Sequence, residues 1–306
     1  MDRTSVPWRG NFCAAITPFT EDGRLDELRF VDNLRLLLAE GIDGLVIAGH
    51  TGEAWALDVD ERFRLFELAA EVAGGRVPVI GAASAIRTAE AVALARGAET
   101  RGLDGVLLTA PAYAMVDEAE VLAHFRAVSD GCALPIMLYN IPRRVGRDLS
   151  PELLQRAAEI ERVVALKQSS PSFDDIGRAI DLCGDRMLVF AGNSAERGLP
   201  AAVLGADGFV SSVEVQALGA EAISLWRLAV AGEIEAARAV QQKCAKVKKF
   251  LGVFGTEPAA LKVAMNHVDR PGGYPRPPIL PLSAEQAAEV EAFMDTMAAV
   301  AVPVPA

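Results

Sequence analysis

Short apolar runs of strand length alternate with amphipathic stretches along the first 215 residues of the chain. The apolar runs are nearly continuous, as expected for strands that are buried on both faces of a parallel sheet. They lie at 12–19, 77–82, 136–140, 163–168 and 188–191. The stretches between them carry apolar residues at steps of three and four, which is typical of amphipathic helices. They lie at 27–39, 59–73, 88–101, 118–129 and 151–158.

One short phrase recurs three times and indicates a repeating architecture. Its copies are Gly41-Ile-Asp-Gly-Leu-Val-Ile, Gly102-Leu-Asp-Gly-Val-Leu-Leu and Gly205-Ala-Asp-Gly-Phe-Val-Ser. Each follows a helix-like stretch, so we interpret its first glycine as a left-handed helix cap and Asp-Gly as a turn into a buried strand. With strand–helix units of roughly 25 to 30 residues, these strands become the second, fourth and eighth of a series. Eight such units close into a (β/α)8 TIM barrel, the predicted α/β fold.

An open, doubly wound sheet is the alternative fold, although no Gly-x-Gly-x-x-Gly follows the first strand. After residue 215 only helix-like stretches follow, at 217–231, 233–250, 257–268 and 283–299. The first would close the barrel. The sequence therefore predicts a catalytic barrel over residues 1–231 and a C-terminal helical appendage over residues 232–306.

We expect the appendage to pack on the barrel or to mediate assembly, and we assign it no chemistry. It contains a basic cluster formed by Lys243, Lys246, Lys248 and Lys249. The simplest interpretation is that these lysines form a solvent-exposed face of a helix.

Composition and charge narrow the class of function. The chain has 306 residues, 51% of them hydrophobic, and can bury a large core. Its net charge of -11 disfavours nucleic acid and anionic membranes as partners, so a small molecule is expected. Four scattered cysteines and the lack of a signal-like N-terminal stretch favour the cytoplasm. The three histidines show no metal-ligand spacing, and neither a metal nor another cofactor is expected.

One lysine stands apart from the other basic residues. Only six of the 30 basic residues are lysines, and Lys167 is the only one before position 243. It lies at the end of the predicted strand at 163–168. A desolvated primary amine can lose its proton and attack a carbonyl, which a guanidinium cannot do. The alternative is a lysine that extends from the strand end into solvent.

Three further polar segments follow predicted strands and share one rim of the barrel, where reacting groups stand. They are Gly49-His-Thr-Gly-Glu53, Thr109-Ala-Pro-Ala-Tyr113 and Tyr139-Asn-Ile-Pro-Arg-Arg144. The Tyr139 hydroxyl can shuttle protons during imine formation, or the residue packs there only for its area. Backbone N–H groups of the glycine-flanked turn, with the Thr51 hydroxyl, can hold a carboxylate. Arg144 can hold a second one, although a surface position is more common for arginine.

In this order and at these separations, the Gly-x-Thr-Gly-Glu turn, the Tyr-Asn-x-Pro-x-Arg-x-Gly segment and the strand-six lysine resemble the dihydrodipicolinate synthase / N-acetylneuraminate lyase family. The resemblance covers essentially the whole chain. It implies a class I, metal-free, pyruvate-dependent lyase without a cofactor, usually a homotetramer. It also implies that Lys167 forms the Schiff base, that Tyr139 shuttles protons and that Thr51 binds the pyruvate carboxylate.

The same resemblance assigns three further positions. Tyr113 matches a tyrosine that reaches into the site of a neighbouring subunit. Gly192 and Val210 match positions whose backbone lines the pocket. Among these substrate-binding positions His50 departs from the synthase pattern, which has a hydroxyl residue there to complete a proton relay; an imidazole is bulkier and ordinarily titrates near neutrality.

These matches lead to one expected function and two alternatives. Arg144 matches the arginine that binds the carboxylate of the aldehyde, so we expect a 4-hydroxy-tetrahydrodipicolinate synthase-like condensation of pyruvate with aspartate semialdehyde. His50 and Ala112 favour the alternative of an aldolase or dehydratase that acts on a 2-oxo-3-deoxy sugar acid or a related 2-oxo acid. The alternative of another class is a barrel that binds 2-oxo acids without turnover.

Overall fold

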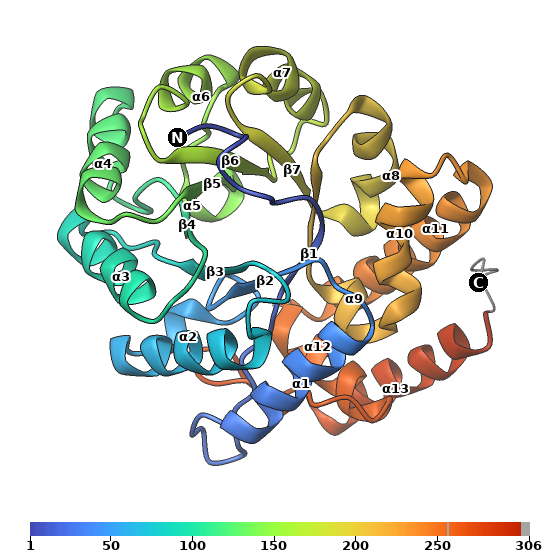
Figure 1. Cartoon of the computed structure of the whole chain (residues 1–306). Coiled ribbons are helices and arrows are strands. Elements are labelled where there is room, and N and C mark those ends of the chain that lie inside the picture. Colours follow the sequence, from blue (N-terminus) through green and yellow to red (C-terminus); the bar gives the residue numbers. More distant parts are fainter. Residues whose placement is uncertain (256, 301–306) are drawn as a thin grey trace.

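The computed structural model describes residues 1–255 and 257–300 and has eight parallel strands in a closed barrel (Figure 1). This confirms the predicted fold class. The strands are β1 (Gly10–Ala14), β2 (Gly44–Ile47), β3 (Val79–Ala82), β4 (Gly105–Leu108), β5 (Ile136–Asn140), β6 (Val163–Gln168), β7 (Leu188–Gly192) and β8 (Gly208–Ser211). The first strand ends five residues earlier than predicted. The reason is that Ile16 donates its backbone N–H to the Gln216 side chain (2.8 Å), so the chain has left the sheet by that point.

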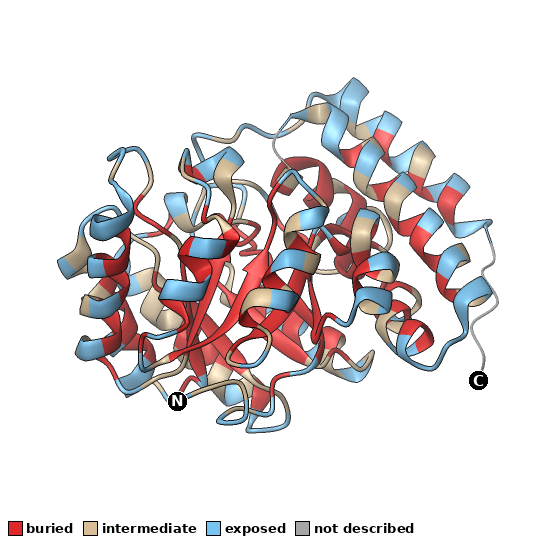
Figure 2. Ribbon diagram, turned by 90° about the horizontal axis from the view of Figure 1, so that it is seen from above, coloured by how far each residue is buried: buried red, intermediate tan, exposed pale blue. Residues whose placement is uncertain are grey.

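Helices form a ring outside the barrel, and the buried residues lie in the strands and on the inward faces of those helices (Figures 1 and 2). Around the barrel these are α1 (Glu27–Ala39), α2 (Val59–Ala73), α3 (Thr88–Thr100), α4 (Glu118–Gly131), α5 (Pro142–Val145), α6 (Pro151–Ala157), α7 (Asp174–Cys183), α8 (Ser194–Leu204), α9 (Val213–Leu218) and α10 (Ala220–Val230). The predicted helix at 217–231 corresponds to α10, which begins three residues later than predicted because Gly219 adopts a positive φ of 62° and separates α9 from α10.

The recurring phrase has a structural role beyond forming a turn. Its first glycine has a positive φ in every copy, as predicted. Its aspartate, at positions 43, 104 and 207, lies just before one strand of the barrel. In each copy it accepts a hydrogen bond, at 2.8–2.9 Å, from a backbone N–H of the neighbouring strand. The donors are Asn11, Val79 and Val189. Each aspartate therefore fixes the start of one strand against its neighbour.

Large side chains fill the barrel interior and leave chemistry to its rim. Trp8, Phe12 and Phe190 are fully buried there, with the Phe12 and Phe190 rings 5.1 Å apart. The second glycine of each phrase makes room for them; a Cβ at Gly44, for example, would lie 2.6 Å from the Phe12 ring. The interior is a packed core below the carboxyl ends of the strands, so a substrate site has to lie above it.

Three further helices form the C-terminal region: α11 (Ile234–Leu251), α12 (Glu257–His267) and α13 (Ala284–Ala298). Helix α11 packs on α8, α9 and α10, and α12 packs on α9 and α13. A buried apolar cluster joins this region to the barrel through Ile16, which follows β1, and through Val213 and Ala217 of α9. None of the helices that the structure describes combines the length and the apolar character needed to cross a membrane.

Candidate active site

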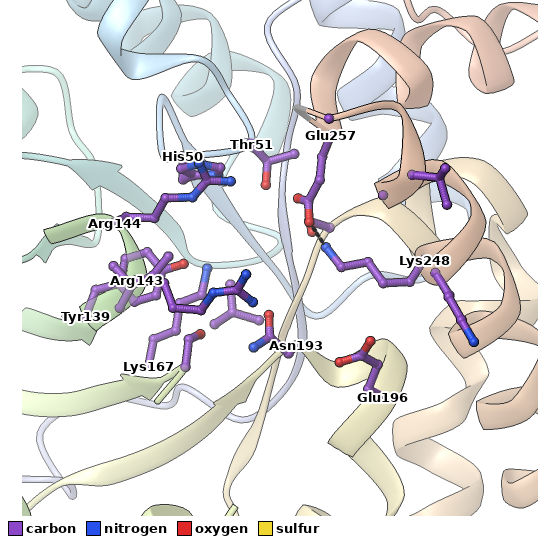
Figure 3. A pocket seen from close by; sticks show the side chains of 18 residues that line it. His50, Thr51, Tyr139, Arg143, Arg144, Lys167, Asn193, Glu196, Lys248 and Glu257 are labelled. Carbon is purple, nitrogen blue, oxygen red and sulfur yellow. Dashed lines mark hydrogen bonds and ion pairs between the residues drawn. The ribbon is translucent and has the colours of Figure 1, made fainter. Parts of the chain in front are cut away.

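A cavity of about 490 Å³ opens at the carboxyl ends of the strands (Figure 3). Its floor and walls come from the ends of β5, β6 and β8 and from the loops after β2, β5 and β7. Its remaining side comes from the C-terminal region, at the end of α11 and the start of α12. Side chains from distant parts of the sequence therefore converge on one space.

Lys167 and Tyr139 lie side by side at the base of this cavity. Strands β5 and β6 pair these two residues in register, so both side chains point the same way. The Lys167 Nζ atom lies 4.1 Å from the centre of the Tyr139 ring, and the lysine is only 6% exposed. This burial excludes the alternative of a lysine that extends into solvent.

Burial also changes how both groups ionise. It lowers the pKa of Lys167 to about 8, because the charged amine is poorly solvated there. About a tenth of an amine with that pKa is neutral at pH 7, compared with less than about a thousandth for an ordinary lysine. Burial raises the pKa of Tyr139 well above its usual value, against the opposing effect of the Ser169 hydroxyl. The tyrosine therefore remains a phenol, which can donate a proton and can take one back once it has become a phenolate.

The turn after β2 brings two predicted residues, His50 and Thr51, to the cavity. The turn is tight: Glu53 has a φ of +54° and donates its backbone N–H to the His50 carbonyl at 3.0 Å. Thr51 is buried, and the His50 ring packs 4.9 Å from the Trp55 ring. Burial, and next the charge of Arg144, lower the pKa of His50 to about 4. The expectation of an imidazole that titrates near neutrality is therefore wrong.

Arg144 reaches the cavity from the short helix α5, and a buried asparagine holds the loop that carries it. The Asn140 side chain exchanges two hydrogen bonds with the backbone of Leu149, accepting from its N–H at 3.1 Å and donating to its carbonyl at 3.2 Å. It also donates to the Gln168 side chain at 2.9 Å. These bonds hold both ends of the loop against strands β5 and β6, so the backbone position of Arg144 is well defined.

The remaining predicted residues have different positions. Val210 lines the cavity, whereas Gly192 lies behind it, where any Cβ would overlap the Ser169 hydroxyl. The glycine therefore acts by leaving room for Ser169, which does line the cavity. Tyr113 does not reach the cavity of its own chain; it is 89% exposed in the loop after β4, with a φ of +67°. Six of the eight predicted residues meet in one space.

A family model, the dihydrodipicolinate synthetase family, matches residues 7–297. The chain belongs to this family. A curated relative, 4-hydroxy-tetrahydrodipicolinate synthase 1 of Halalkalibacterium halodurans, is 34% identical over 278 residues, which cover 91% of this chain and 93% of the relative. Membership makes the chain a class I lyase, whose chemistry proceeds through a Schiff base.

Solved structures of family members share the fold closely. A dihydrodipicolinate synthase from Bacillus anthracis superimposes with a TM-score of 0.90 at 29% identity, covering 95% of this chain and 99% of that one. A prophage protein of the family from E. coli K12, solved in complex with pyruvate, gives a TM-score of 0.91 at 25% identity, covering 96% of this chain and 99% of the other. The barrel and its C-terminal helices are therefore the common scaffold of the family.

Sequence reasoning missed the residues that the C-terminal region supplies to the cavity. Lys248 and Glu257 form an ion pair there, and Lys249 also lines the cavity. Lys243 is buried and pairs with Glu221 at 2.7 Å. The interpretation of the basic cluster as a solvated face is wrong for Lys243 and Lys248. A row of charges on a helix does not reveal which of them faces a neighbouring element, so the sequence held no signal for this part of the site.

Proposed function

We propose that this chain condenses pyruvate with aspartate semialdehyde, in the manner of its relatives named 4-hydroxy-tetrahydrodipicolinate synthase. The observation that carries the proposal is a buried primary amine, Lys167, beside the Tyr139 phenol at the base of the cavity. The cationic side chains that line the cavity beside Lys167, namely Arg143, Arg144, Lys248 and Lys249, outnumber its two glutamates, Glu196 and Glu257. A cavity with this excess of positive charge suits substrates that carry carboxylates.

The first half-reaction begins when the neutral Lys167 amine adds to C2 of pyruvate and gives a carbinolamine. The hydroxyl group of the carbinolamine leaves as water with a proton that Tyr139 donates, and an imine remains. The positively charged imine nitrogen then withdraws electrons from C3. The Tyr139 phenolate takes a proton from C3, which restores the phenol, and an enamine forms.

In the second half-reaction the enamine carbon attacks the aldehyde carbon, and the aldehyde oxygen takes up a proton that the Tyr139 phenol donates. Water or the amine of the bound product then displaces Lys167 from the imine, which restores the free enzyme. Throughout, the backbone of the β2 turn and the Thr51 hydroxyl hold the pyruvate carboxylate, while Arg144 holds the carboxylate of the aldehyde.

We propose that His50 replaces the hydroxyl residue of the proton relay. With a pKa of about 4, its imidazole is neutral at pH 7 and offers one N–H donor and one acceptor nitrogen. Its Nε2 atom is buried and has no hydrogen-bond partner among the described residues. A buried nitrogen in that state is suited to exchange a proton with a bound substrate or with water.

Borohydride reduction in the presence of pyruvate tests the core of the proposal. We expect a mass increase that maps to Lys167, because borohydride reduces the imine to a stable secondary amine. No adduct would instead support a barrel that binds 2-oxo acids without turnover. A coupled assay then compares pyruvate plus aspartate semialdehyde with a panel of 2-oxo-3-deoxy acids.

The second candidate function is cleavage or dehydration of a 2-oxo-3-deoxy sugar acid. Asn193 and Glu196 favour it, because both line the cavity and can bind hydroxyl groups. The imine at Lys167 would form in the same way. Faster turnover of a sugar acid than of aspartate semialdehyde in the coupled assay would select this function.

Replacing Tyr139 with phenylalanine should lower kcat by about a hundredfold to ten-thousandfold, the usual contribution of a positioned acid or base. The pyruvate KM should change by less than about threefold, because the ring that packs beside Lys167 remains. Steady-state kinetics at fixed aldehyde concentration measure both values. A variant that keeps its wild-type kcat would assign the proton transfers to another group.

Replacing Arg144 with alanine should raise the KM for a carboxylated aldehyde by about ten- to a hundredfold, since a charge-assisted hydrogen bond contributes about 1.5–3 kcal/mol. The rate of imine formation with pyruvate alone should be close to that of the wild type. Assays with aspartate semialdehyde and with an aldehyde that lacks a carboxylate separate the two effects. Equal losses with both aldehydes would remove Arg144 from this role.

We infer that Tyr113 acts across a subunit contact in a homotetramer. The loop that carries it also exposes Met115, and large exposed side chains in one loop support a protein contact. Sedimentation analysis of the purified protein tests the assembly. A stable monomer with full activity would remove Tyr113 from the catalytic residues.

We also propose that the enzyme works in the cytoplasm. Its four cysteines, Cys13, Cys132, Cys183 and Cys244, are all buried free thiols. Free thiols suit a reducing compartment. Fractionation of cells that produce the untagged protein tests this location.

A further inference from the structure

The Lys248–Glu257 ion pair differs from the other lysine–glutamate pairs of the C-terminal region. In the other two pairs the lysine also donates to backbone carbonyls: Lys243 to Val300, and Lys262 to Thr17 and Tyr274. Those lysines lie outside the cavity. Within the described residues, Lys248 bonds only to Glu257, and both members of the pair line the cavity. The pair is therefore placed to meet a substrate as well as to join α11 to α12.

Opposite charges face each other across this cavity. Figure 3 shows Arg144 and His50 on one side and Glu257 with Lys248 on the other. The charges of Arg144 and Glu257 both act on His50, since Arg144 lowers its pKa and Glu257 raises it. Burial, the largest single effect, raises the pKa of Glu257, but the charge and the hydrogen bond of Lys248, together with the nearby charge of Arg144, lower it by more, so the net shift is downward and the glutamate is ionised.

One carboxylate oxygen of Glu257 is available for a ligand. Lys248 contacts Oε1, and no hydrogen bond to Oε2 occurs in the part of the chain that the structure describes. A carboxylate oxygen in a cavity accepts hydrogen bonds most strongly from a cation. Arg144, across the cavity, supplies the complementary positive charge for a carboxylate.

We propose that Glu257, oriented by Lys248, binds the ammonium group of the aldehyde substrate while Arg144 binds its carboxylate. The cavity then selects a zwitterionic amino aldehyde over an aldehyde of the same length that carries only a carboxylate. This inference rests on the proposed function, since it concerns the acceptor that the enamine attacks. Glu257 becomes a specificity-determining residue that the C-terminal region contributes to the barrel site.

A Glu257→Gln variant tests this role, because it removes the negative charge and keeps the shape. The measured quantity is kcat/KM for aspartate semialdehyde and for succinic semialdehyde, which lacks the ammonium group. We expect the wild type to prefer aspartate semialdehyde, and the variant to lose about ten- to a hundredfold with that substrate. With succinic semialdehyde the change should stay within about threefold. Borohydride trapping with pyruvate should remain at the wild-type level, which shows that the variant is folded.

The matched control is Glu235→Gln, which removes an exposed carboxylate on α11 that pairs with Arg238 outside the cavity. It should leave the ratio of the two kcat/KM values unchanged. Equal losses of Glu257→Gln with both aldehydes, or loss of the pyruvate adduct, would show that the pair is only structural and would overturn the inference. If the wild type forms the adduct but does not turn over aspartate semialdehyde, the proposed function fails, and this inference fails with it.

Discussion

Replacing Lys167 with alanine is expected to abolish the borohydride-trapped adduct with pyruvate and to lower kcat/KM by at least about a thousandfold. Among the described residues, the Lys167 amine is the only group at the base of the cavity that can form an imine, since no second lysine lies beside the Tyr139 ring. Intact-mass measurement after reduction detects the adduct, and peptide mapping locates it. The coupled assay measures the loss of turnover.

A Lys167→Arg variant is the matched control, since it keeps a positive charge and a long side chain but cannot form an imine. It should be as inactive as the alanine variant. If either variant still forms an adduct, another amine carries the chemistry. In the wild type, adduct formation should rise as the pH increases through about 8, because burial lowers the pKa of Lys167 to about 8 and only the neutral amine attacks. A rise that begins only near the ordinary lysine pKa would contradict this explanation.

The barrel could be predicted because its signals are local and repeated. The helices at 27–39 and 59–73 and the strands at 136–140 and 163–168 match the structure in both bounds. Packing and turns between residues that are close in the sequence determine where these strands end. In a barrel, the carboxyl ends of all eight strands meet at one rim. Once Tyr139 and Lys167 are assigned to neighbouring strands, their meeting follows from the fold.

The C-terminal side of the cavity could not be predicted in this way. Lys248 and Glu257 are surface-type residues on helices, and only the packing of α11 and α12 on the barrel turns them toward the cavity. The low pKa of His50 could not be predicted from the sequence either, since it depends on burial and on the charge of Arg144 from a different loop. Contacts between distant segments decide both features.

Replacing Lys262 with methionine should lower the free energy of unfolding by about 3–5 kcal/mol, because it leaves a buried carboxylate without its partner. Lys262 and Glu53 form an ion pair in which the side chains are 1% and 0% exposed. Burial raises the pKa of Glu53 and lowers that of Lys262 to about 8, so each charge depends on the other. Denaturant unfolding at a fixed protein concentration measures the change.

The double variant Glu53→Gln/Lys262→Met provides the control, because it removes both charges together. It should recover part of the loss, and, with the Glu53→Gln variant as the second single change, the non-additivity measures the coupling of the pair. The recovery stays incomplete because the carbonyls of Thr17 and Tyr274 still lose the donor that Lys262 provides at 2.7–2.8 Å. Since Glu53 ends the turn that presents Thr51, the single variant should also raise the pyruvate KM. A loss of stability below about 1 kcal/mol would mean that water or a rearranged side chain replaces the lysine, and that the turn is not held by this pair.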